Sequence, residues 1–326
     1  MTNSSSERPS EFDLIAKLFA PLADAAPGAL GLKDDAAIAA PPAGHELVIT
    51  TDALIESVHF RNDDPADSIA KKALRVNLSD LAAKGAAPIG YLLALSLPAR
   101  TDMRWLEEFT RGLRSDQDAF GISLYGGDTT ATPGPLTLAI TAFGSVPTGT
   151  MLKRSGAKAG DDVYVSGTIG DAGAGLGVLA GKTEARGREA LVARYRVPEP
   201  RLKLGTALRA VASASLDVSD GLIADLAHIA DVSDVRIVLE AAAIPISAAA
   251  QAFWGAEAVT RAATAGDDYE IAFTAPPANA ASVAKAAKST GTPVTRIGRV
   301  ETGSGTLLVD SHGAAIALKS RGYTHF

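Results

Sequence analysis

The chain has 326 residues, a net charge of −6 and no cysteine. At roughly 100–200 residues per domain, this length predicts two domains. The acidic balance disfavours a nucleic-acid-binding protein, which normally presents a basic face. The absence of cysteine excludes disulfides, thiolate nucleophiles, iron–sulfur clusters and Cys-based zinc sites, and it fits a cytoplasmic protein. No apolar run reaches the roughly 18–20 residues of a membrane span, and we expect residues 1–9 to form a loose tail rather than a signal peptide.

The first half of the chain alternates helical and strand-like patterns. Apolar residues at helical spacing predict helices over 11–23, 64–85 and 101–121, with Ser10 and Thr101 as N-caps and Gly85 and Gly121 at two of the ends. Apolar runs between turn residues predict strands over 46–52, 88–98, 122–130 and 135–146. The last two strands are placed to form a hairpin across the turn TTATPG.

A Gly-, Thr- and Lys-rich linker over 146–160 separates the two halves. The second half predicts a strand over 161–167, a helix over 198–212 and a strand, tight turn and helix over 215–230. Later strands are predicted at VRIVLE, YEIAFTA, VTRIGRV and TLLVD. We therefore expect an α/β (α+β) protein with one domain over 10–148 and a second over 149–326.

The placement of the aspartates is the most informative feature of the sequence. Several follow apolar strands and are flanked by small residues; this group comprises Asp52, Asp128, Asp217 and Asp220, while Asp35 follows a turn and Asp80 lies in a largely apolar helix. An unpaired buried carboxylate costs several kcal/mol, so a cluster of them needs a cation. Without cysteine, and with five histidines, the expected cation is Mg²⁺, or else Mn²⁺. Mg²⁺ bridges phosphates during phosphoryl transfer.

Helix capping and ion pairing are the alternatives for each single aspartate. Asp217 and Asp220 could cap the helix that begins at position 221, and Asp80 could pair with Lys84 at i, i+4 spacing. For five or more aspartates in such places, the metal hypothesis is favoured.

The segment GLGVLAGKT at 175–183 approximates two nucleotide-binding motifs and satisfies neither. For a P-loop, Gly175 lies one residue too early. For a dinucleotide fold, Gly175, Gly177 and Ala180 match, but a charged helical region at 182–200 replaces the required second strand. Close helix packing is the favoured explanation of these glycines.

Several other residues each leave two interpretations open. Gly127 in GGDTT allows a ligand to approach the backbone, or it marks a hairpin turn. His59 contacts a substrate or is a structural hydrogen-bonding group. Arg154 meets a nucleotide phosphate or is a solvated linker residue. Asp267 and Asp268 lie at a turn before a strand, where they bind an ammonium or thiazolium-like cation or simply terminate the strand.

Taken together, these strings resemble the thiamine-monophosphate kinase family. The resemblance runs nearly end to end, from SEFDLIAKLF to RGYTHF, through LKDDAA, TTDALIESVHF, DPADSIAKKALRVNLSDLAAKGAAP, LYGGDTT, KRSGAKAGDDVYVSGTIGD, RYRVPEPRL, LDVSDGLIADLAHIA and AGDDYEIAFT. It implies a fold shared with aminoimidazole ribonucleotide synthetase: two α/β domains, with the N-terminal sheet at the interface of a homodimer. It also implies ATP-dependent phosphorylation of thiamine monophosphate to thiamine diphosphate, the last step of cofactor synthesis, by a cytoplasmic enzyme.

The resemblance also implies roles for individual residues. The Mg²⁺ ligands implied are Asp35, Thr50, Thr51, Asp52, Asp80, Asp128, Asp217 and Asp220. The ATP contacts implied are Gly127, Asp128, Arg154 and Ser219, and the substrate contacts are His59, Asp267 and Ser320. Among these, Asp128, Arg154 and Asp220 are expected to act in catalysis.

Three positions depart from the family pattern. Lys33 replaces the glycine usual before the paired aspartates, and Asp267 stands where the family usually has Glu, one methylene longer. Ser320 stands where some relatives place an aromatic that packs on the substrate ring. The substrate side of the expected site is therefore less closely matched than its nucleotide side.

The chemistry expected is a direct in-line transfer to an already anionic phosphate oxygen, which needs no strong general base. The alternatives are another ATP-using enzyme of the same superfamily, such as aminoimidazole ribonucleotide synthetase, or a non-catalytic thiamine-phosphate-binding protein. Selenophosphate synthetases and hydrogenase-maturation relatives usually rely on a cysteine or selenocysteine, and this chain has no cysteine.

Overall fold

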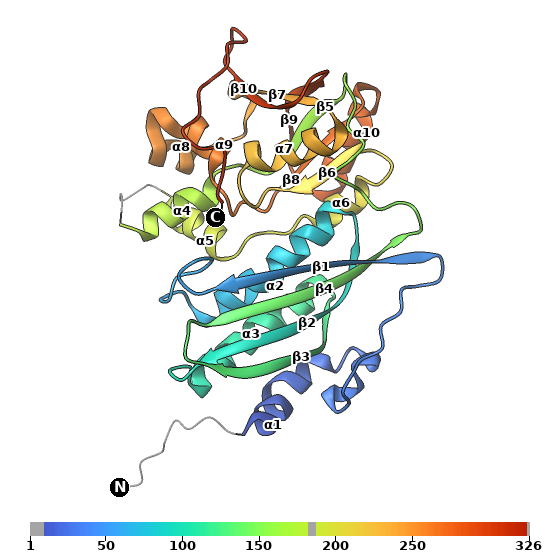
Figure 1. Cartoon of the computed structure of the whole chain (residues 1–326), viewed down its shortest axis with the longest axis vertical. Helices are drawn as coiled ribbons and strands as arrows, with labels where there is room; N and C mark the ends of the chain where they lie inside the picture. Colours follow the sequence, from blue (N-terminus) through green and yellow to red (C-terminus); the bar gives the residue numbers. More distant parts are fainter. Residues whose placement is uncertain (1–9, 182–186, 325–326) are drawn as a thin grey trace. The chain divides into compact units, whose positions relative to one another are not determined.

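The computed structural model describes residues 10–181 and 187–324 (Figure 1). The tail expected at residues 1–9 lies outside these ranges. The chain divides into two compact units, one of residues 1–81 and 87–147 and one of residues 82–86 and 148–326. No helix within the described ranges combines the length and apolar character that a bilayer span needs.

The first unit is built on a four-stranded sheet. Its strands are β1 (His45–Ile55), β2 (Ala87–Pro98), β3 (Ser123–Thr132) and β4 (Thr137–Pro147). They lie in the order β1-β4-β2-β3, with β4 antiparallel to both neighbours and β2 parallel to β3. The expected hairpin between the last two strands is therefore wrong, because β2 lies between them. The apolar β4 occupies an interior position of the sheet, while β3, rich in Gly and Thr, forms an edge.

Two long helices cover one face of this sheet: α2 (Ala66–Ala83) and α3 (Met103–Phe120) (Figure 1). Each ends at a glycine in the left-handed region, Gly85 at φ 68° and Gly121 at φ 66°, as expected. The N-cap of α3 is Asp102, whose carboxylate accepts a hydrogen bond from the Trp105 N–H at 2.8 Å. The cap expected at Thr101 is wrong by one residue, because Asp102 is the last residue with extended backbone angles.

The expected helix over 11–23 is broken into short turns. Only α1 (Glu11–Leu14) is α-helical, with the Ser10 hydroxyl accepting the Asp13 N–H at 3.3 Å, and π and 3₁₀ turns follow as far as Ala23. Pro21 has no N–H to donate, so the regular hydrogen-bonding pattern does not continue through it. These turns pack at the β3 edge of the sheet.

The second unit is built on a six-stranded sheet. Its strands are β5 (Asp162–Ser166), β6 (Ala214–Asp217), β7 (Arg236–Glu240), β8 (Ile271–Ala275), β9 (Val294–Glu301) and β10 (Gly305–Val309). Their order is β10-β7-β9-β5-β8-β6, and every pairing is antiparallel except that of β10 with β7.

Seven helices accompany this sheet within the described residues: α4 (Asp171–Leu179), α5 (Arg188–Arg196), α6 (Leu202–Ala207), α7 (Leu222–Ser233), α8 (Ala248–Trp254), α9 (Ala258–Thr264) and α10 (Ala280–Thr290). Alternate strand residues divide between two apolar clusters: Val163 and Val165 pack with α7, while Tyr164 packs with α6 and α10. The helix expected over 198–212 is shorter than predicted, since α6 spans six residues.

Glycines in α4 allow close packing against α5. A Cβ added at Gly175 would lie 2.1 Å from the carbonyl oxygen of Leu191 in α5. A Cβ added at Gly177 would lie 2.6 Å from the ring of Phe253 in α8, so close packing explains both glycines without a nucleotide, as the packing interpretation predicted. Residues 182–183 of the same segment lie outside the described residues.

We predict that Gly175→Ala lowers the free energy of unfolding by about 2–3 kcal/mol, because overpacking against backbone forces the helices apart. Gly134→Ala is the control, since its added Cβ would meet only the Thr132 hydroxyl oxygen at 3.4 Å. Urea denaturation measures the free energy of unfolding of both variants and of the parent chain. Equal stability of Gly175→Ala and the parent chain would contradict the packing argument.

Candidate active site

A pocket of about 740 Å³ lies over the face of the first sheet that α2 and α3 leave uncovered, here called the helix-free face. Its lining brings together three residues of the expected site, Asp35, Gly127 and Asp128, with strand residues of β2 and β4 and part of the N-terminal segment. Asp128 lies opposite Ala94 of β2 and is exposed, so a small neighbour leaves its carboxylate open to the pocket. The first unit therefore has a concave site that contains two of the expected metal ligands, Asp35 and Asp128, and two of the expected nucleotide contacts, Gly127 and Asp128.

Gly127 and Asp128 lie inside β3, three or more residues from its end, and not in a turn. A Cβ at Gly127 would lie 1.9 Å from the Leu93 carbonyl oxygen of β2. The glycine is therefore required by the approach of the two strands, and the hairpin-turn alternative for GGDTT is wrong.

The other expected ligands of the first unit lie on β1 and α2. The Thr50 hydroxyl donates to Asp80 Oδ2 at 2.5 Å. Strand alternation places Thr50 and Asp52 on the helix-covered face and Thr51 on the opposite face, where its hydroxyl lies 3.1 Å from that of Thr141 in the pocket lining. The set thus divides between the two faces of the sheet. Asp52 lies inside β1 rather than at its end, because the strand continues to Ile55.

Oxygen donors dominate these positions, and carboxylate and hydroxyl oxygens are the ligands that Mg²⁺ accepts. Within residues 10–181 and 187–324, however, no three His, Asp or Glu side chains come together as a metal-binding group. By donor chemistry the residues fit a hard cation. Among them, Thr50 contacts Asp80, and Asp35 and Asp128 line the same pocket. The Lys84 Nζ donates a hydrogen bond to the Ser215 carbonyl at 3.0 Å.

His59 follows β1 in a loop fixed by hydrogen bonds. Its Nδ1 accepts the Ile55 N–H at 3.0 Å, and its carbonyl accepts from the buried Lys72 ammonium at 2.9 Å. The hydrogen bond at Nδ1 therefore supports the interpretation of His59 as a structural hydrogen-bonding group.

In the second unit, Asp217 ends β6 and Asp220 lies in the turn before α7. Neither residue is the N-cap of α7; the N-cap is Gly221, which has no side chain. The turn is held by Asp225, whose Oδ2 accepts the backbone N–H groups of Ser219, Asp220 and Gly221, each at 3.0 Å. Burial, followed by the charge of Asp220, raises the pKa of Asp225 to about 7. Sequence reasoning missed Asp225, although its position in the first turn after DGL is typical of a residue that satisfies helix N-terminal amides.

The loop that carries Asp267 has an unusual backbone. Asp267 and Tyr269 both have positive φ, 70° and 52°, which side chains other than glycine rarely adopt. The Asp267 N–H donates to the Ser219 carbonyl at 2.8 Å, and the Tyr269 hydroxyl donates to Asp267 Oδ1 at 3.2 Å. This loop and the turn before α7 are therefore joined by hydrogen bonds.

Two further expected site residues lie on the surface of the second unit. Arg154 is exposed, and its carbonyl accepts the Ser233 hydroxyl at 3.4 Å. Ser320 is also exposed and lines a second cavity of about 530 Å³, whose apolar wall includes Phe253 and Trp254.

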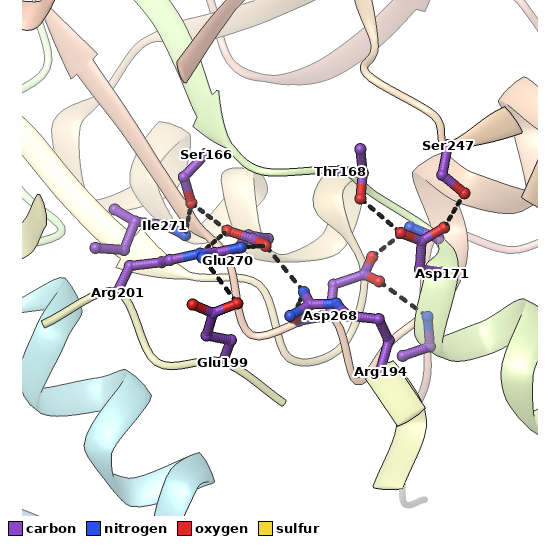
Figure 2. Close-up of polar contacts among 12 residues, drawn as sticks. Ser166, Thr168, Asp171, Arg194, Glu199, Arg201, Ser247, Asp268, Glu270 and Ile271 are labelled. Atoms are coloured by element: carbon purple, nitrogen blue, oxygen red, sulfur yellow. Dashed lines mark hydrogen bonds and ion pairs between the residues drawn. The ribbon is translucent and has the colours of Figure 1, made fainter. Parts of the chain in front are cut away.

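Two fully buried carboxylates follow Asp267 in the sequence, and neither was expected as a structural anchor (Figure 2). Asp268 accepts the N–H groups of Gly170 at 2.6 Å and Ala172 at 3.3 Å, at the N-terminus of α4. Glu270 is held by Arg194 and Arg201. The sequence shows these groups in the strings RYRVPEPRL and AGDDYEIAFT, but no spacing rule connects residues about 70 positions apart.

The fold and the pocket define a class of protein. Family models described as AIR synthase related protein match the chain in two parts, the N-terminal domain over residues 33–146 and the C-terminal domain over residues 158–310. Structures of the hydrogenase maturation protein HypE from E. coli share this fold, with a TM-score of 0.80 at 22% identity and coverage of 96% and 98% of the two chains.

Several relatives with higher sequence identity are named thiamine-monophosphate kinase. The thiamine-monophosphate kinase of Caulobacter vibrioides is 45% identical over 303 residues (91% of this chain, 86% of the relative). That of Escherichia coli K12 is 41% identical over 322 residues (97% and 98%). The crystal structure of thiamine-monophosphate kinase from Stenotrophomonas maltophilia has a TM-score of 0.84 at 42% identity (94% and 98%). AaThiL complexed with AMPPCP and TMP has a TM-score of 0.78 at 30% identity (90% and 91%). The chain belongs to the thiamine-monophosphate kinase family, and the expectations of family, fold class and kinase activity are confirmed.

We predict a pH-dependent contribution of Asp268 to stability. Burial raises the pKa of Asp268 well above its ordinary value of 3.8. Between that value and the higher folded-state pKa, the folded chain binds the proton more tightly than the unfolded chain, so this group favours folding less as the pH rises. In Asp268→Asn the single amide oxygen can still accept the Gly170 N–H, the amide nitrogen leaves the Ala172 N–H without this acceptor, and the side chain does not titrate. The lost hydrogen bond lowers the stability of the variant by an amount that does not depend on pH. The stability of the parent chain minus that of the variant should therefore fall as the pH rises from about 4 towards 8. Urea titrations across this range measure it, and a difference that rises with pH would contradict it.

Proposed function

We propose that the protein catalyses the Mg²⁺-dependent transfer of the γ-phosphoryl group of ATP to thiamine monophosphate, giving thiamine diphosphate and ADP. The observation that carries this proposal is the pocket in which Asp35, Gly127 and Asp128 meet. It is supported by the relatives named thiamine-monophosphate kinase and by the structure of AaThiL complexed with AMPPCP and TMP.

The phosphates of ATP are assigned to the first unit and to the linker after it. Gly127 and Asp128 face the pocket, and we assign them to the nucleotide together with Arg154 and Ser219. Arg154 is exposed, so its guanidinium is open to a phosphate without first losing a buried partner.

We assign the divalent ions to the expected ligands Asp35, Thr50, Thr51, Asp52, Asp80, Asp128, Asp217 and Asp220, whose oxygens suit Mg²⁺. When bound, Mg²⁺ would supply positive charge to offset the repulsion between two phosphate groups. Asp128 and Asp220 are the two whose loss should impair the reaction most directly, and we therefore assign them and Arg154 to catalysis.

The acceptor is a phosphate oxygen that is anionic near pH 7, so in-line attack on the γ-phosphorus needs no general base. What the chain must supply is alignment of the two phosphates and charge around them. The loops that carry these residues are fixed by internal hydrogen bonds, as for the turn held by Asp225, and this rigidity suits alignment.

The thiamine end is assigned to His59, Asp267 and Ser320. The cationic thiazolium suits the Asp267 carboxylate, which the Tyr269 hydroxyl orients. The cavity beside Ser320 has the aromatic residues Phe253 and Trp254 in its wall. They offer an apolar surface for the substrate ring beside Ser320.

We further propose a cytoplasmic homodimer, with domain 10–148 binding ATP and Mg²⁺ and forming the interface, and domain 149–326 completing the site. The helix-free face of the first sheet supports this, because Ile49 and Leu92 are 65% and 42% exposed on it. Exposed apolar side chains on one sheet face are typical of a surface that another chain covers.

The test is an assay of the purified chain with ATP, Mg²⁺ and thiamine monophosphate, in which chromatography follows the thiamine species. We expect thiamine diphosphate to appear one-for-one with ADP and to be lost on adding EDTA, because the carboxylate ligands then hold no cation. Free thiamine is the control acceptor. Binding of thiamine monophosphate by calorimetry without ADP formation would instead identify a sensor, and phosphorylation of another acceptor only would identify a different enzyme of the superfamily.

We predict that Asp128→Asn lowers kcat by about 10²-fold or more, because a neutral amide replaces a charged oxygen ligand at the phosphates. Asp118→Asn is the matched control, since Asp118 is exposed on α3, away from the pocket lining. Steady-state kinetics at saturating Mg²⁺ compare the two variants, with circular dichroism confirming that both are folded. A near-normal kcat for Asp128→Asn would remove Asp128 from the site.

A further inference from the structure

The string RYRVPEPRL has no role in the function proposed above, and the structure gives it one. Its two outer arginines, Arg194 in α5 and Arg201 before α6, both contact Glu270, the residue just before β8 (Figure 2). The prolines between them cannot continue α5, so the chain turns and returns to the same carboxylate. Two arginines close in sequence are thus used on one buried group.

Glu270 is completely buried and fully engaged. Arg201 donates to both carboxylate oxygens, at 2.7 Å from Nε and 2.6 Å from a terminal nitrogen, and Arg194 donates at 2.9 Å. The Ser166 hydroxyl donates to Oε2 at 2.5 Å and accepts the Ile271 N–H at 2.8 Å. A Cβ at Gly167 would lie 2.1 Å from Glu270 Oε1, so the carboxylate is also enclosed by backbone.

The same residues fix the loop on the other side of Glu270. Arg194 donates a second hydrogen bond, at 2.9 Å, to the backbone carbonyl of Asp268. The Asp268 carboxylate is anchored at the N-terminus of α4. Residues 268 and 270 are therefore held in place. Asp267 and Tyr269 beside them have positive φ, and their side chains are joined by a hydrogen bond.

Stability alone does not account for this arrangement. A buried ion pair seldom stabilises a fold more than apolar residues of the same volume, because its desolvation offsets its attraction. Positive φ at two residues that are not glycine is likewise unfavourable and persists only where the surroundings enforce it. Both features are explained if the geometry of the loop, rather than its stability, is what matters.

We propose that Arg194 and Arg201, acting through Glu270, are positioning residues that set the place of the Asp267 carboxylate and so the affinity for the cationic end of the acceptor. This inference rests on the proposed function, which assigns Asp267 to thiamine monophosphate. Because an aspartate side chain is short, the place of its carboxylate depends strongly on where the backbone holds it.

The test compares Arg201→Gln with Arg299→Gln. Arg299 makes an exposed ion pair with Glu301 in the same unit, so its variant removes one arginine charge without touching the loop. We expect Arg201→Gln to raise the Kd for thiamine monophosphate, measured by calorimetry, about tenfold. The KM for thiamine monophosphate should rise by a similar factor, while the KM for ATP changes less than about twofold. Arg201→Lys, which keeps the charge but not the two-pronged contact, should restore the melting temperature better than the affinity.

A double-mutant cycle distinguishes positioning from general damage. In an Asp267→Ala background, Arg201→Gln should alter thiamine monophosphate affinity less than about twofold, because the group it positions is gone. Full additivity of the two changes, or an Arg201→Gln chain that is folded and binds normally, would overturn the inference. If Arg201→Gln does not fold, Arg194→Gln, which removes a single bond to Glu270, takes its place in the cycle. If the parent chain binds thiamine monophosphate without forming product, the proposed reaction fails while the cycle still tests the positioning.

Discussion

The structure depends on how it satisfies carboxylates that are removed from water. Asp225, Asp268 and Glu270 are buried, and each is surrounded by donors from the chain itself. An ionised carboxylate in such a place would be costly if it were unpartnered. Because its partners are loop amides and arginines, satisfying the charge also fixes the loops. The buried acids thus fix the backbone of the two loops that carry the partly exposed Asp220 and Asp267.

In the first unit, strand geometry rather than buried acids determines where the expected site residues lie. β1 and β3 present successive side chains to opposite faces, so Thr50 and Thr51 serve different sides of one sheet. The Thr50–Asp80 contact connects β1 to α2, while Asp128 lies on the helix-free face with the pocket. A rigid sheet is a good support for such groups, since a strand cannot shift by one residue without turning its apolar side chains outwards.

Much of the architecture could be predicted from the sequence, and the errors have physical causes. Apolar runs gave all ten strands of the described residues, and the glycines after α2 and α3 marked where those helices end. The false hairpin arose because strand order depends on long-range pairing, which local spacing does not encode. Asp225, Arg194 and Arg201 were missed as structural anchors for the same reason: their partners become visible only when distant segments meet. The family resemblance supplied residue roles that spacing alone left open, as for His59 and Asp267.

The three amides that Asp225 occupies have a consequence for how the turn before α7 can meet a nucleotide. Successive N–H groups at the start of a helix ordinarily form a ready receptor for phosphate. Here the chain has filled that receptor with its own side chain. Under the proposed function, which assigns Ser219 to the nucleotide, the negative charge of Asp220 beside it would repel a bare polyanion and would favour one that arrives with its counter-ions. The turn would then select for the metal complex of the nucleotide over the free nucleotide, a discrimination achieved by closing a binding site rather than by building one.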